Sequence, residues 1–435
     1  MTKQAKKLTR RVLIIGGGFA GIKCARKLAG DSRFTVTLID RTNHHLFQPL
    51  LYQVATASLA APDIARSIRQ VLAKAENVTV LMDDIKKLDP KAKTATGASG
   101  TEYEWDYLLL AAGARTSFFG NPEWEQHTLG LKSLADAQSV RRMILTNLEL
   151  AERTTDLAER KKLMTVAIVG GGPTGVELAG AFASLVHKAM KDEFRRLDTS
   201  DLKIILIEDA PRLLTAFDDD QSEYTRHRLE SLGVDVRTGH RVSSVEARCL
   251  RFTDGTSLES AAIIWAAGVE AHPLTRQLGV PLADAAGRIT PELDLSIPGN
   301  PDIFVAGDLV KMTDRGGVVV PGVAPAATQM GEHVAKVLKE EARLQPDFAD
   351  RKGSLRPKFR YFDKGLMAII GKNVAVVKSG RLKLRGFLAW VAWLLVHILF
   401  LIGFRNKLAV LLGWAFAYLK NNPGARIIVH PPTDS

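Results

Sequence analysis

The chain has 435 residues, of which 46% are hydrophobic and 24% charged, and a formal net charge of +12 at pH 7. This length predicts about three domains of ~150 residues each, and the composition is that of a globular protein with an ample core. Cys24 and Cys249, the two cysteines, lie far apart and without C-x-x-C or zinc-ligand spacing. They argue against a thiol relay and a metal site, and they suit a reducing compartment.

A glycine-rich turn follows an apolar run at two places in the chain. The glycines of the two turns are Gly16, Gly18 and Gly21, after residues 12–15, and Gly170, Gly172 and Gly175, after residues 166–169. Each segment predicts a buried parallel strand, a tight turn, and a helix whose N-terminus faces a pyrophosphate. Because this context occurs twice, we expect two dinucleotide-binding sites.

An acidic residue follows each turn at the end of the next predicted strand. Asp40 lies 19 residues after the last glycine of the first turn, and Glu208 lies 33 residues after that of the second. The longer second spacing predicts an extended helix over 176–197. A carboxylate here accepts hydrogen bonds from ribose hydroxyls and repels a 2′-phosphate, so the second site favours NADH over NADPH. Arg212 is close enough in sequence to weaken this preference.

The same order of motifs occurs twice, which indicates a duplicated nucleotide-binding unit. An apolar strand ends at Ala112 and Gly113, and its counterpart over 263–265 leads to Gly268. We therefore expect an α/β protein with two Rossmann-like dinucleotide-binding domains and a C-terminal helical segment that associates with a membrane. The predicted boundaries are 1–160 with 287–340 for the first domain, 161–286 for the second, and 341–435 for the C-terminal region.

Several connecting elements can also be placed from the sequence. Residues 64–76 predict a helix and residues 78–82 a short strand. A third strand-and-glycine marker ends at Asp308, and a further helix is expected to begin around Ala327. A charged linker over about 339–357 leads to the C-terminal region.

The most apolar part of the chain lies near its end. Residues 387–404 include His397 as their one polar residue, and a second apolar run covers 408–419. At 1.5 Å per residue the first run is about 27 Å long, the lower limit for crossing a bilayer. Tryptophans and flanking lysines and arginines are typical of an interface with anionic lipid. We expect membrane-anchoring helices over about 387–419, and a buried hairpin or a homodimer core is the alternative.

The sequence also carries information about localisation and about nucleic-acid binding. The start of the chain is charged and has no apolar core, so we expect no cleavable signal. The protein is expected to be peripheral or monotopic on the cytoplasmic face of the inner membrane. The positive charge does not indicate nucleic acid, because no RNA- or DNA-reading motif is visible.

The paired turns, together with the segment that ends at Asp308, resemble the disulfide-reductase-like flavoproteins. Within them the chain is most similar to the type II NADH:quinone oxidoreductases. The narrower markers are residues 44–55, 175–178 and 321–329 and the apolar tail. The resemblance implies non-covalent FAD in the first site, NADH as electron donor in the second, and a membrane quinone as acceptor, without proton pumping.

The resemblance also implies roles for individual residues. Glu177, Gln329 and Gln48 are the expected catalytic residues. The expected cofactor-binding residues are Gly16, Gly18, Gly21, Asp40, Arg41, Pro49, Ala112, Gly113, Asp308, Gly170, Gly172, Gly175, Glu208 and Gly268. Glu177 follows the second turn, and partial burial there would raise its pKa and suit it to proton relay. Pro325 stands where the family has its first quinone-site glutamine, so only Gln329 is carried over.

Two other functions remain open from the sequence. A reductase that passes electrons from FAD to a soluble ferredoxin-type acceptor would not need the apolar tail. A non-catalytic redox sensor would bind both nucleotides without transferring a hydride. A sulfide:quinone reductase is disfavoured, because it needs a close set of cysteines.

Overall fold

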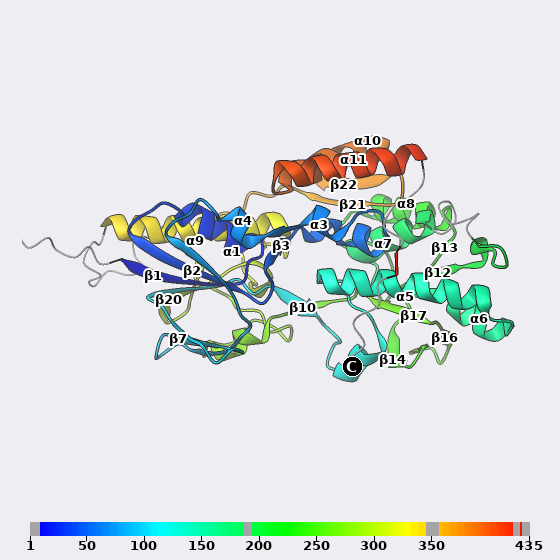
Figure 1. Cartoon of the computed structure of the whole chain (residues 1–435), viewed down its shortest axis with the longest axis horizontal. Coiled ribbons are helices and arrows are strands. Elements are labelled where there is room, and N and C mark those ends of the chain that lie inside the picture. Colours follow the sequence, from blue (N-terminus) through cyan, green and yellow to red (C-terminus); the bar gives the residue numbers. More distant parts are fainter. Residues whose placement is uncertain (1–8, 186–193, 345–355, 421–426, 429–435) are drawn as a thin grey trace, which may run out of the picture. The chain divides into compact units, whose positions relative to one another are not determined.

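The computed structural model describes residues 9–185, 194–344, 356–420 and 427–428 of the chain (Figure 1). Contacts divide the chain into two compact units, each assembled from separate stretches of sequence. The first unit takes its residues from Met1–His45, Arg66–Arg115 and Val269–Lys364, and the second from Leu46–Ala65, Thr116–Gly268 and Gly365–Ser435. The expected boundaries assign one domain to FAD and another to NADH, and this assignment stays a prediction.

The first unit is organised around a six-stranded sheet with the strand order β19-β20-β9-β1-β2-β5. Its strands are β1 (Arg10–Ile15), β2 (Phe34–Asp40), β5 (Val78–Met82), β9 (Tyr107–Leu110), β19 (Ser296–Ile297) and β20 (Asn300–Val305). All neighbours pair in parallel except β19, which runs antiparallel to β20. The chain continues from β1 to β2 on one side, while β9 pairs with β1 on the other. The turn after β1 therefore lies at the switch point where open α/β sheets bind ligands.

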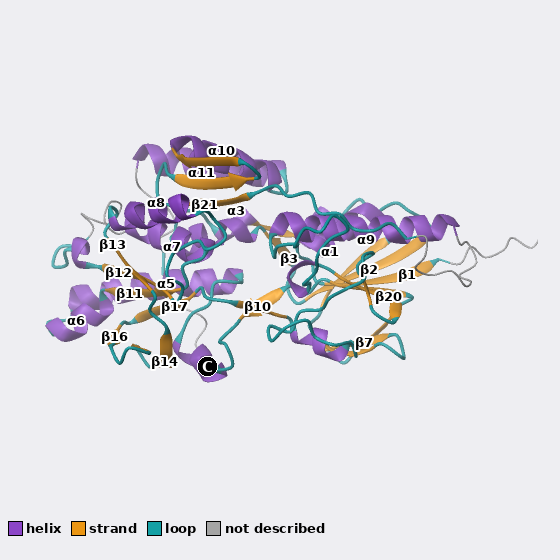
Figure 2. Ribbon diagram, turned by 180° about the vertical axis from the view of Figure 1, so that it is seen from behind, coloured by secondary structure: helices purple, strands orange, loops and turns teal. Residues whose placement is uncertain are grey.

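Two helices cover one face of this sheet. α1 (Phe19–Leu28) and α9 (Ala324–Leu344) lie side by side there, and β6 (Ile85–Asp89), β7 (Thr94–Gly97) and β8 (Glu102–Glu104) form a small antiparallel sheet on the other side (Figure 2). The two helices approach so closely that a Cβ atom on Gly331 would lie 2.1 Å from the carbonyl oxygen of Ala20. The unit also contains α4 (Ile68–Val71) and the 3-10 turns η5 (Pro273–Gln277) and η6 (Gly307–Leu309).

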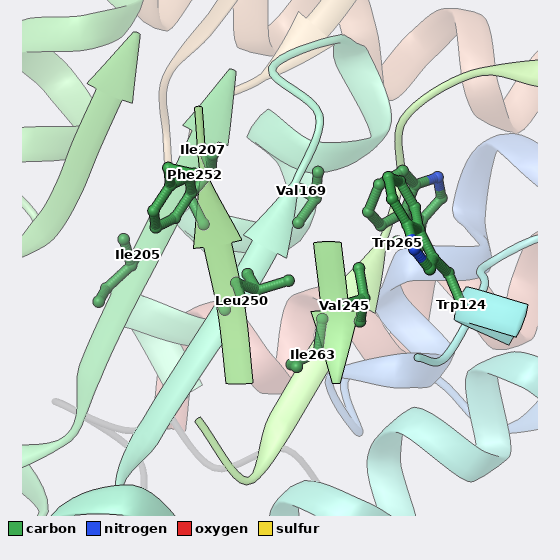
Figure 3. Close-up of a cluster of buried hydrophobic side chains, with 10 residues drawn as sticks. Trp124, Val169, Ile205, Ile207, Val245, Leu250, Phe252, Ile263 and Trp265 are labelled. Carbon is green, nitrogen blue, oxygen red and sulfur yellow. The ribbon is translucent and has the colours of Figure 1, made fainter. Parts of the chain in front are cut away.

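The second unit has its own parallel sheet, in the order β13-β12-β11-β17. Its strands are β11 (Thr165–Val169), β12 (Lys203–Glu208), β13 (Val234–Thr238) and β17 (Ala262–Trp265), and an antiparallel layer contains β14 (Val242–Glu246), β15 (Cys249–Phe252) and β16 (Ser257–Glu259). Figure 3 shows the apolar cluster in which Val169 and Ile207 of the parallel sheet meet Leu250 and Phe252. Trp265 in this cluster donates its indole N–H to the carbonyl of Ser117 at 2.9 Å.

Helices pack around the second sheet. They are α2 (Leu51–Ala55), α3 (Ala61–Ile64), α5 (Leu134–Arg153), α6 (Leu157–Leu163), α7 (Pro173–Ser184) and α8 (Asp219–Glu230), with 3-10 turns η1 (Gln48–Leu50), η2 (Pro122–His127) and η4 (Thr199–Asp201). α7 packs against β11 and β12, and α2 packs against both α5 and α7. α5 begins with a capping box, in which Ser133 Oγ accepts from the N–H of Asp136 and the carboxylate of Asp136 accepts from that of Ser133.

Residues after 365 add a small sheet and a helical hairpin to the second unit. The strands are β21 (Leu366–Ile369), β22 (Ala375–Ser379) and β23 (Leu382–Gly386), and the helices are α10 (Phe387–Phe400) and α11 (Phe404–Lys420). Lys378 and Lys383 of this sheet both pair with Asp218, the residue that precedes α8. These two hydrogen bonds lower the pKa of Asp218 to about 2. The added sheet is thereby joined to the nucleotide-binding part of its own unit.

The helical hairpin is apolar on both its inner and its outer side. Ala389, Trp393 and His397 of α10 are buried, at the i, i+4 spacing of one helix face. The exposed large hydrophobic residues of the hairpin are Phe387, Leu388, Leu395, Leu399, Phe400, Phe404, Leu408, Leu411, Leu412 and Phe416. α10 has 14 residues, about 21 Å at 1.5 Å per residue, which is less than a ~30 Å hydrocarbon core. Among the described helices, none has the length and apolar character of a membrane span.

Two short strand pairs lie where the chain passes between the units. They are β3 (His44–Leu46) with β4 (Ala65–Ser67), and β10 (Ala114–Thr116) with β18 (Val269–Ala271). The predicted helix over 64–76 is wrong, because residues 65–67 form strand β4 and pair with β3. The N–H of Phe47 donates to Ile64, and the N–H of Ile68 donates to Asn43. These bonds hold residues 65–67 extended and leave only α3 and α4 as single turns.

Other expected boundaries differ at helix ends. α7 ends at Ser184 and residues 194–198 are not helical, so the predicted helix does not reach Leu197; residues 186–193 lie outside the described part. α9 begins at Ala324, three residues earlier than expected. Pro325 fits there, because the first turn of a helix does not need its missing N–H. The expected linker over 339–357 is helical to Leu344, and residues 345–355 lie outside the described part.

Candidate active site

The first glycine turn is fixed by the backbone around it. Gly16 has φ +107°, and a Cβ atom there would lie 2.3 Å from the carbonyl oxygen of Ala111, so the position requires glycine. The N–H of Gly17 donates to Oδ2 of Asp40 at 2.6 Å. Oδ1 of Asp40 accepts from the N–H and hydroxyl of Thr42, both at 2.7 Å. The carboxylate predicted to bind ribose therefore also holds the turn.

Space for an anion lies in front of this turn. Gly18 precedes α1 as its N-cap, and no side chain caps the first N–H groups of the helix. A Cβ atom built on Gly18 meets no atom within 4 Å. Open space before the uncapped N-terminus of a helix at a switch point fits a diphosphate. The residues of the first unit thus fit FAD.

The second turn repeats this geometry in the second unit. Gly170 has φ +115°, and its Cβ atom would lie 2.7 Å from the backbone of Ala266. Glu208 accepts from the N–H of Gly171 at 2.5 Å and from that of Ala210 at 2.8 Å. Gly172 precedes α7, and a Cβ atom there also meets no atom within 4 Å. The second unit therefore fits a second dinucleotide. Its Glu208 has the position that Asp40 has in the first unit.

The two strand–alanine–glycine turns are similar in backbone but not in their surroundings. Gly113 and Gly268 both have φ +70°. A Cβ atom on Gly113 would meet open space, whereas one on Gly268 would lie 2.5 Å from the ring of Phe119. An aromatic ring therefore covers the turn at the carboxyl end of β17. Arg41, directly after Asp40, is exposed.

Arg212 lies close to Glu208 in sequence, and the structure shows the partners of its guanidinium. Its guanidinium donates to the carbonyl oxygens of Phe217 at 2.9 Å and Thr215 at 3.1 Å. It also lies 3.3 Å from the carboxylate of Asp219. Because these partners hold the guanidinium within the loop that precedes α8, Arg212 is committed to that loop.

Asp308 and Gln329 lie in the first unit, in η6 and α9. Asp308 is half-buried, and its Oδ1 would lie 3.7 Å from a Cβ atom on Gly322. The amide of Gln329 pairs with the main chain of Phe362: Nε2 donates to the carbonyl at 3.0 Å, and Oε1 accepts from the N–H at 2.9 Å. The structure thus gives Gln329 a defined structural partner, which the sequence did not predict.

Gln48, Pro49 and Glu177 lie in the second unit. Gln48 and Pro49 begin the half-buried 3-10 turn that leads into α2. Glu177 is buried in the first turns of α7, where burial raises its pKa to about 8. The N–H of Ile369, 3.4 Å from Oε1, and the indole of Trp393 favour the charged form and oppose this shift in part. The expected raised pKa of Glu177 is therefore present, with burial as its main cause.

No role was predicted for several polar groups that have defined partners in the structure. His45 is buried, and its Nδ1 lies 3.0 Å from the carbonyl oxygen of Gly17 in the first turn. Trp414 of α11 donates its indole N–H to Oε1 of Gln53 at 2.7 Å, and Gln53 donates to the hydroxyl of Tyr52 at 2.8 Å. The i, i+4 spacing of the buried residues of α10 was the available signal for its inner face.

The two cysteines lie in different units, and neither forms a disulfide. Cys24 is buried within α1, and burial raises the pKa of its thiol to about 12. Cys249 is half-buried in β15 of the other unit. No group of three histidine, cysteine or acidic side chains in the described part of the chain could hold a metal ion.

Known proteins resemble the chain along nearly all of its length. The family model for pyridine nucleotide-disulphide oxidoreductases matches residues 10–331. A type II NADH:quinone oxidoreductase, Ndh, of Mycobacterium tuberculosis is 40% identical over 425 residues, which cover 95% of this chain and 89% of the relative. A second one from the same organism, NdhA, is 38% identical over 96% of this chain and 89% of its own length.

The chain belongs to the type II NADH:quinone oxidoreductases. This group lies within the pyridine nucleotide-disulphide oxidoreductase family. The same fold occurs in NDH2 from Plasmodium falciparum, solved in complex with NADH, with a TM-score of 0.84, 20% identity, and coverage of 97% of this chain and 100% of that one. The sulfide:quinone oxidoreductase of Aquifex aeolicus has a TM-score of 0.69 at 18% identity and covers 97% of this chain and 96% of its own. The predicted α/β fold class and family are confirmed, and the association of the C-terminal helices with a membrane stays a prediction.

Proposed function

We propose that this protein oxidises NADH and reduces a membrane quinone by way of non-covalent FAD, without pumping protons. One observation carries the proposal: two nucleotide-binding turns with strand-end carboxylates occur in a chain 40% identical to a type II NADH:quinone oxidoreductase. FAD fits the first unit and NADH the second. FAD held in the first unit would supply the redox chemistry between NADH, a hydride donor, and quinone, which takes up two electrons and two protons.

The residues of this chain bind and orient the two nucleotides. The N-termini of α1 and α7 face the pyrophosphates across the open positions at Gly18 and Gly172. Asp40 and Glu208 accept hydrogen bonds from ribose hydroxyls. Arg41, Pro49, Ala112, Gly113, Asp308 and Gly268 complete the proposed cofactor contacts.

Glu177, Gln48 and Gln329 are the proposed catalytic residues. A carboxyl group with a pKa of about 8 keeps its proton at neutral pH. Glu177 is therefore able to hold and donate a proton in the pH range where quinone reduction consumes protons. Gln48 is proposed to contact the flavin. Gln329 is proposed to lie near the flavin ring and the quinone, and its Oε1 and one N–H of Nε2 are paired with Phe362, which fixes the orientation of the amide.

Attachment of the hairpin of α10 and α11 to a membrane is part of the proposal. Its exposed leucines and phenylalanines suit a lipid surface, and Arg381, Arg385, Arg405 and Lys407 supply positive charge for anionic headgroups. We place the protein peripherally on the cytoplasmic face of the inner membrane. A homodimer formed through the same apolar face is the competing outcome.

Purification from membranes followed by spectroscopy and assay tests this function. We expect a flavin absorption spectrum that NADH bleaches under anaerobic conditions and that a short-chain quinone restores. Rapid turnover with a ferredoxin-type acceptor but none with quinone would favour the soluble-acceptor reductase. Bleaching by NADH without transfer to any acceptor would favour a redox sensor.

A further inference from the structure

The buried carboxyl group of Glu177 has the C-terminal helix α10 as a neighbour, which the sequence did not predict. α7 carries the carboxyl group, and β21 contributes the N–H of Ile369, 3.4 Å from Oε1. α10 contributes Trp393, which is fully buried and whose indole acts on the same carboxyl. Nε1 of Trp393 is buried and has no hydrogen bond of normal geometry to any described residue. Its N–H is therefore available to Glu177.

Trp393 is held firmly in this position. His397, one turn later, stacks on its ring with the centroids 3.9 Å apart and an interplanar angle of 24°. Nδ1 of His397 lies 2.7 Å from the carbonyl oxygen of Trp393, so it carries the proton of that hydrogen bond. The ring of Trp414 lies 5.6 Å away on the side of α11. The indole is thus preorganised by both helices of the hairpin.

The groups that face Glu177 are otherwise uncharged. α2, which packs against α7, contains no charged side chain, and the hydroxyl of its Tyr52 accepts from Nε2 of Gln53 at 2.8 Å. His397 of α10 is neutral at pH 7, because burial lowers its pKa to about 4. No charged side chain of the described β21, α8 or central strands β11–β13 contributes to the shift of Glu177. Burial and the two N–H groups therefore decide its proton affinity.

We propose that Trp393 is a positioning residue for Glu177, and that α10 thereby sets the proton affinity of this carboxyl in addition to meeting the membrane. The proposal rests on the proposed role of Glu177 in proton transfer. The indole N–H stabilises the carboxylate, while the bulk of α10 keeps water away from it. These two contributions have opposite signs and can be separated by different variants.

Infrared titration of the oxidised FAD-loaded protein tests the proposal. The protonated carboxyl of Glu177 is followed by its C=O band, which Glu177→Gln identifies by removing it. Trp393→Phe replaces the indole by a phenyl ring, which is still apolar but has no N–H, so we expect the titration midpoint to rise by about one pH unit. Trp390→Phe is the matched control on the same helix. The ring of Trp390 lies 5.3 Å from that of Phe387 at an interplanar angle of 33°, whereas the indole that acts on Glu177 is that of Trp393, so the midpoint of this control should equal that of the unmodified protein.

Trp393→Ala in the full-length protein supplies the second measurement. Removal of the whole indole opens space for water beside Glu177, so the midpoint should fall toward that of an ordinary glutamate. A midpoint in Trp393→Phe equal to that of Trp390→Phe would overturn the proposal, as would an unchanged midpoint in Trp393→Ala. The titration uses neither NADH nor quinone, so it can fail while the proposed oxidoreductase function stands, and the reverse.

Discussion

Gly18 and Gly172 hold the same position in two turns, and a side chain at either would project into open space. Substitution should therefore leave folding intact and block only the approach of a pyrophosphate. We expect Gly18→Val to lose FAD, measured by flavin absorbance after gel filtration. Gly172→Val should keep FAD and bind NADH at least about tenfold more weakly, a loss of at least ~1.4 kcal/mol.

A third glycine provides the control for folding. A Cβ atom on Gly21 would lie 1.9 Å from the carbonyl oxygen of Gly16, so Gly21→Val should disrupt the turn itself and lower thermal stability. Stoichiometric FAD in purified Gly18→Val would show that the first turn does not hold the flavin.

We propose that donor choice depends on Glu208, because the guanidinium of Arg212 is hydrogen-bonded within the loop before α8. We expect kcat/KM to favour NADH over NADPH by at least tenfold, on the order of 1.4 kcal/mol. Arg212→Ala should leave this ratio within about twofold, since the guanidinium does not face a 2′-phosphate. Steady-state kinetics with both donors measure the ratio, and equal rates in the unmodified enzyme would contradict the assignment of Glu208.

Burial of Glu177 also makes stability depend on pH. Its pKa is about 8 in the folded protein and near 4.5 when unfolded. Between these values the folded state holds a proton that the unfolded state has released, so the free energy of unfolding falls as pH rises. Each unit of difference is worth about 1.4 kcal/mol. Glu177→Gln should remove this loss, and the difference between the two proteins in urea unfolding at pH 5 and pH 8 measures it.

Two buried histidines also make stability depend on pH, so the unmodified protein has to be compared with Glu177→Gln. Burial lowers the pKa of His333 and His397 to about 4, so each contributes stability that is lost as pH falls below their unfolded value. Because both proteins carry these histidines, their effect cancels in the difference. A difference that is constant across the range would show that Glu177 is ionised in the folded state.

At the scale of the element, one face of α10 is exposed and the other is buried in the protein. Leu395 and Leu399 are exposed, while Trp393 and His397 are buried. We expect the double variant Leu395→Gln, Leu399→Gln to bind lipid vesicles at least about tenfold more weakly, because each leucine loses ~2 kcal/mol of apolar burial. Unfolding should change by less than about 0.5 kcal/mol. Unchanged vesicle binding would favour a homodimer face, and analytical ultracentrifugation would then show dissociation of the variant.

At the scale of the whole molecule, the net charge of +12 and the apolar hairpin should act together at a membrane. Salt at 1 M reduces the screening length from ~10 Å at 0.1 M to ~3 Å. We therefore expect high salt to weaken binding to anionic vesicles but not to release the protein, because apolar contact persists. Cosedimentation across a salt series tests this, and complete release by salt would assign attachment to charge alone.

The sequence was sufficient for the features that repeat or that have regular spacing. Both turns, their carboxylates and the parallel sheets follow from apolar runs, glycines and strand ends close together in the chain. The extended segment 65–67 was missed, because its pairing depends on residues about twenty positions away. Two other contacts between distant segments were also missed. They are the pairing of Gln329 with Phe362 and the position of Trp393 beside Glu177. Such contacts join segments whose local patterns carry no information about each other.

Each unit combines stretches of chain that are separated by parts of the other. During synthesis the strands β11–β13 and α7 leave the ribosome long before β21 and α10, which cover Glu177. The second unit therefore cannot complete its apolar interior until its last described helices have been made. Until then the newly made chain exposes the inner surface that α10 will cover. After its synthesis the hairpin also exposes its outer apolar face. We expect this interval to be the period of greatest dependence on chaperones and on contact with lipid.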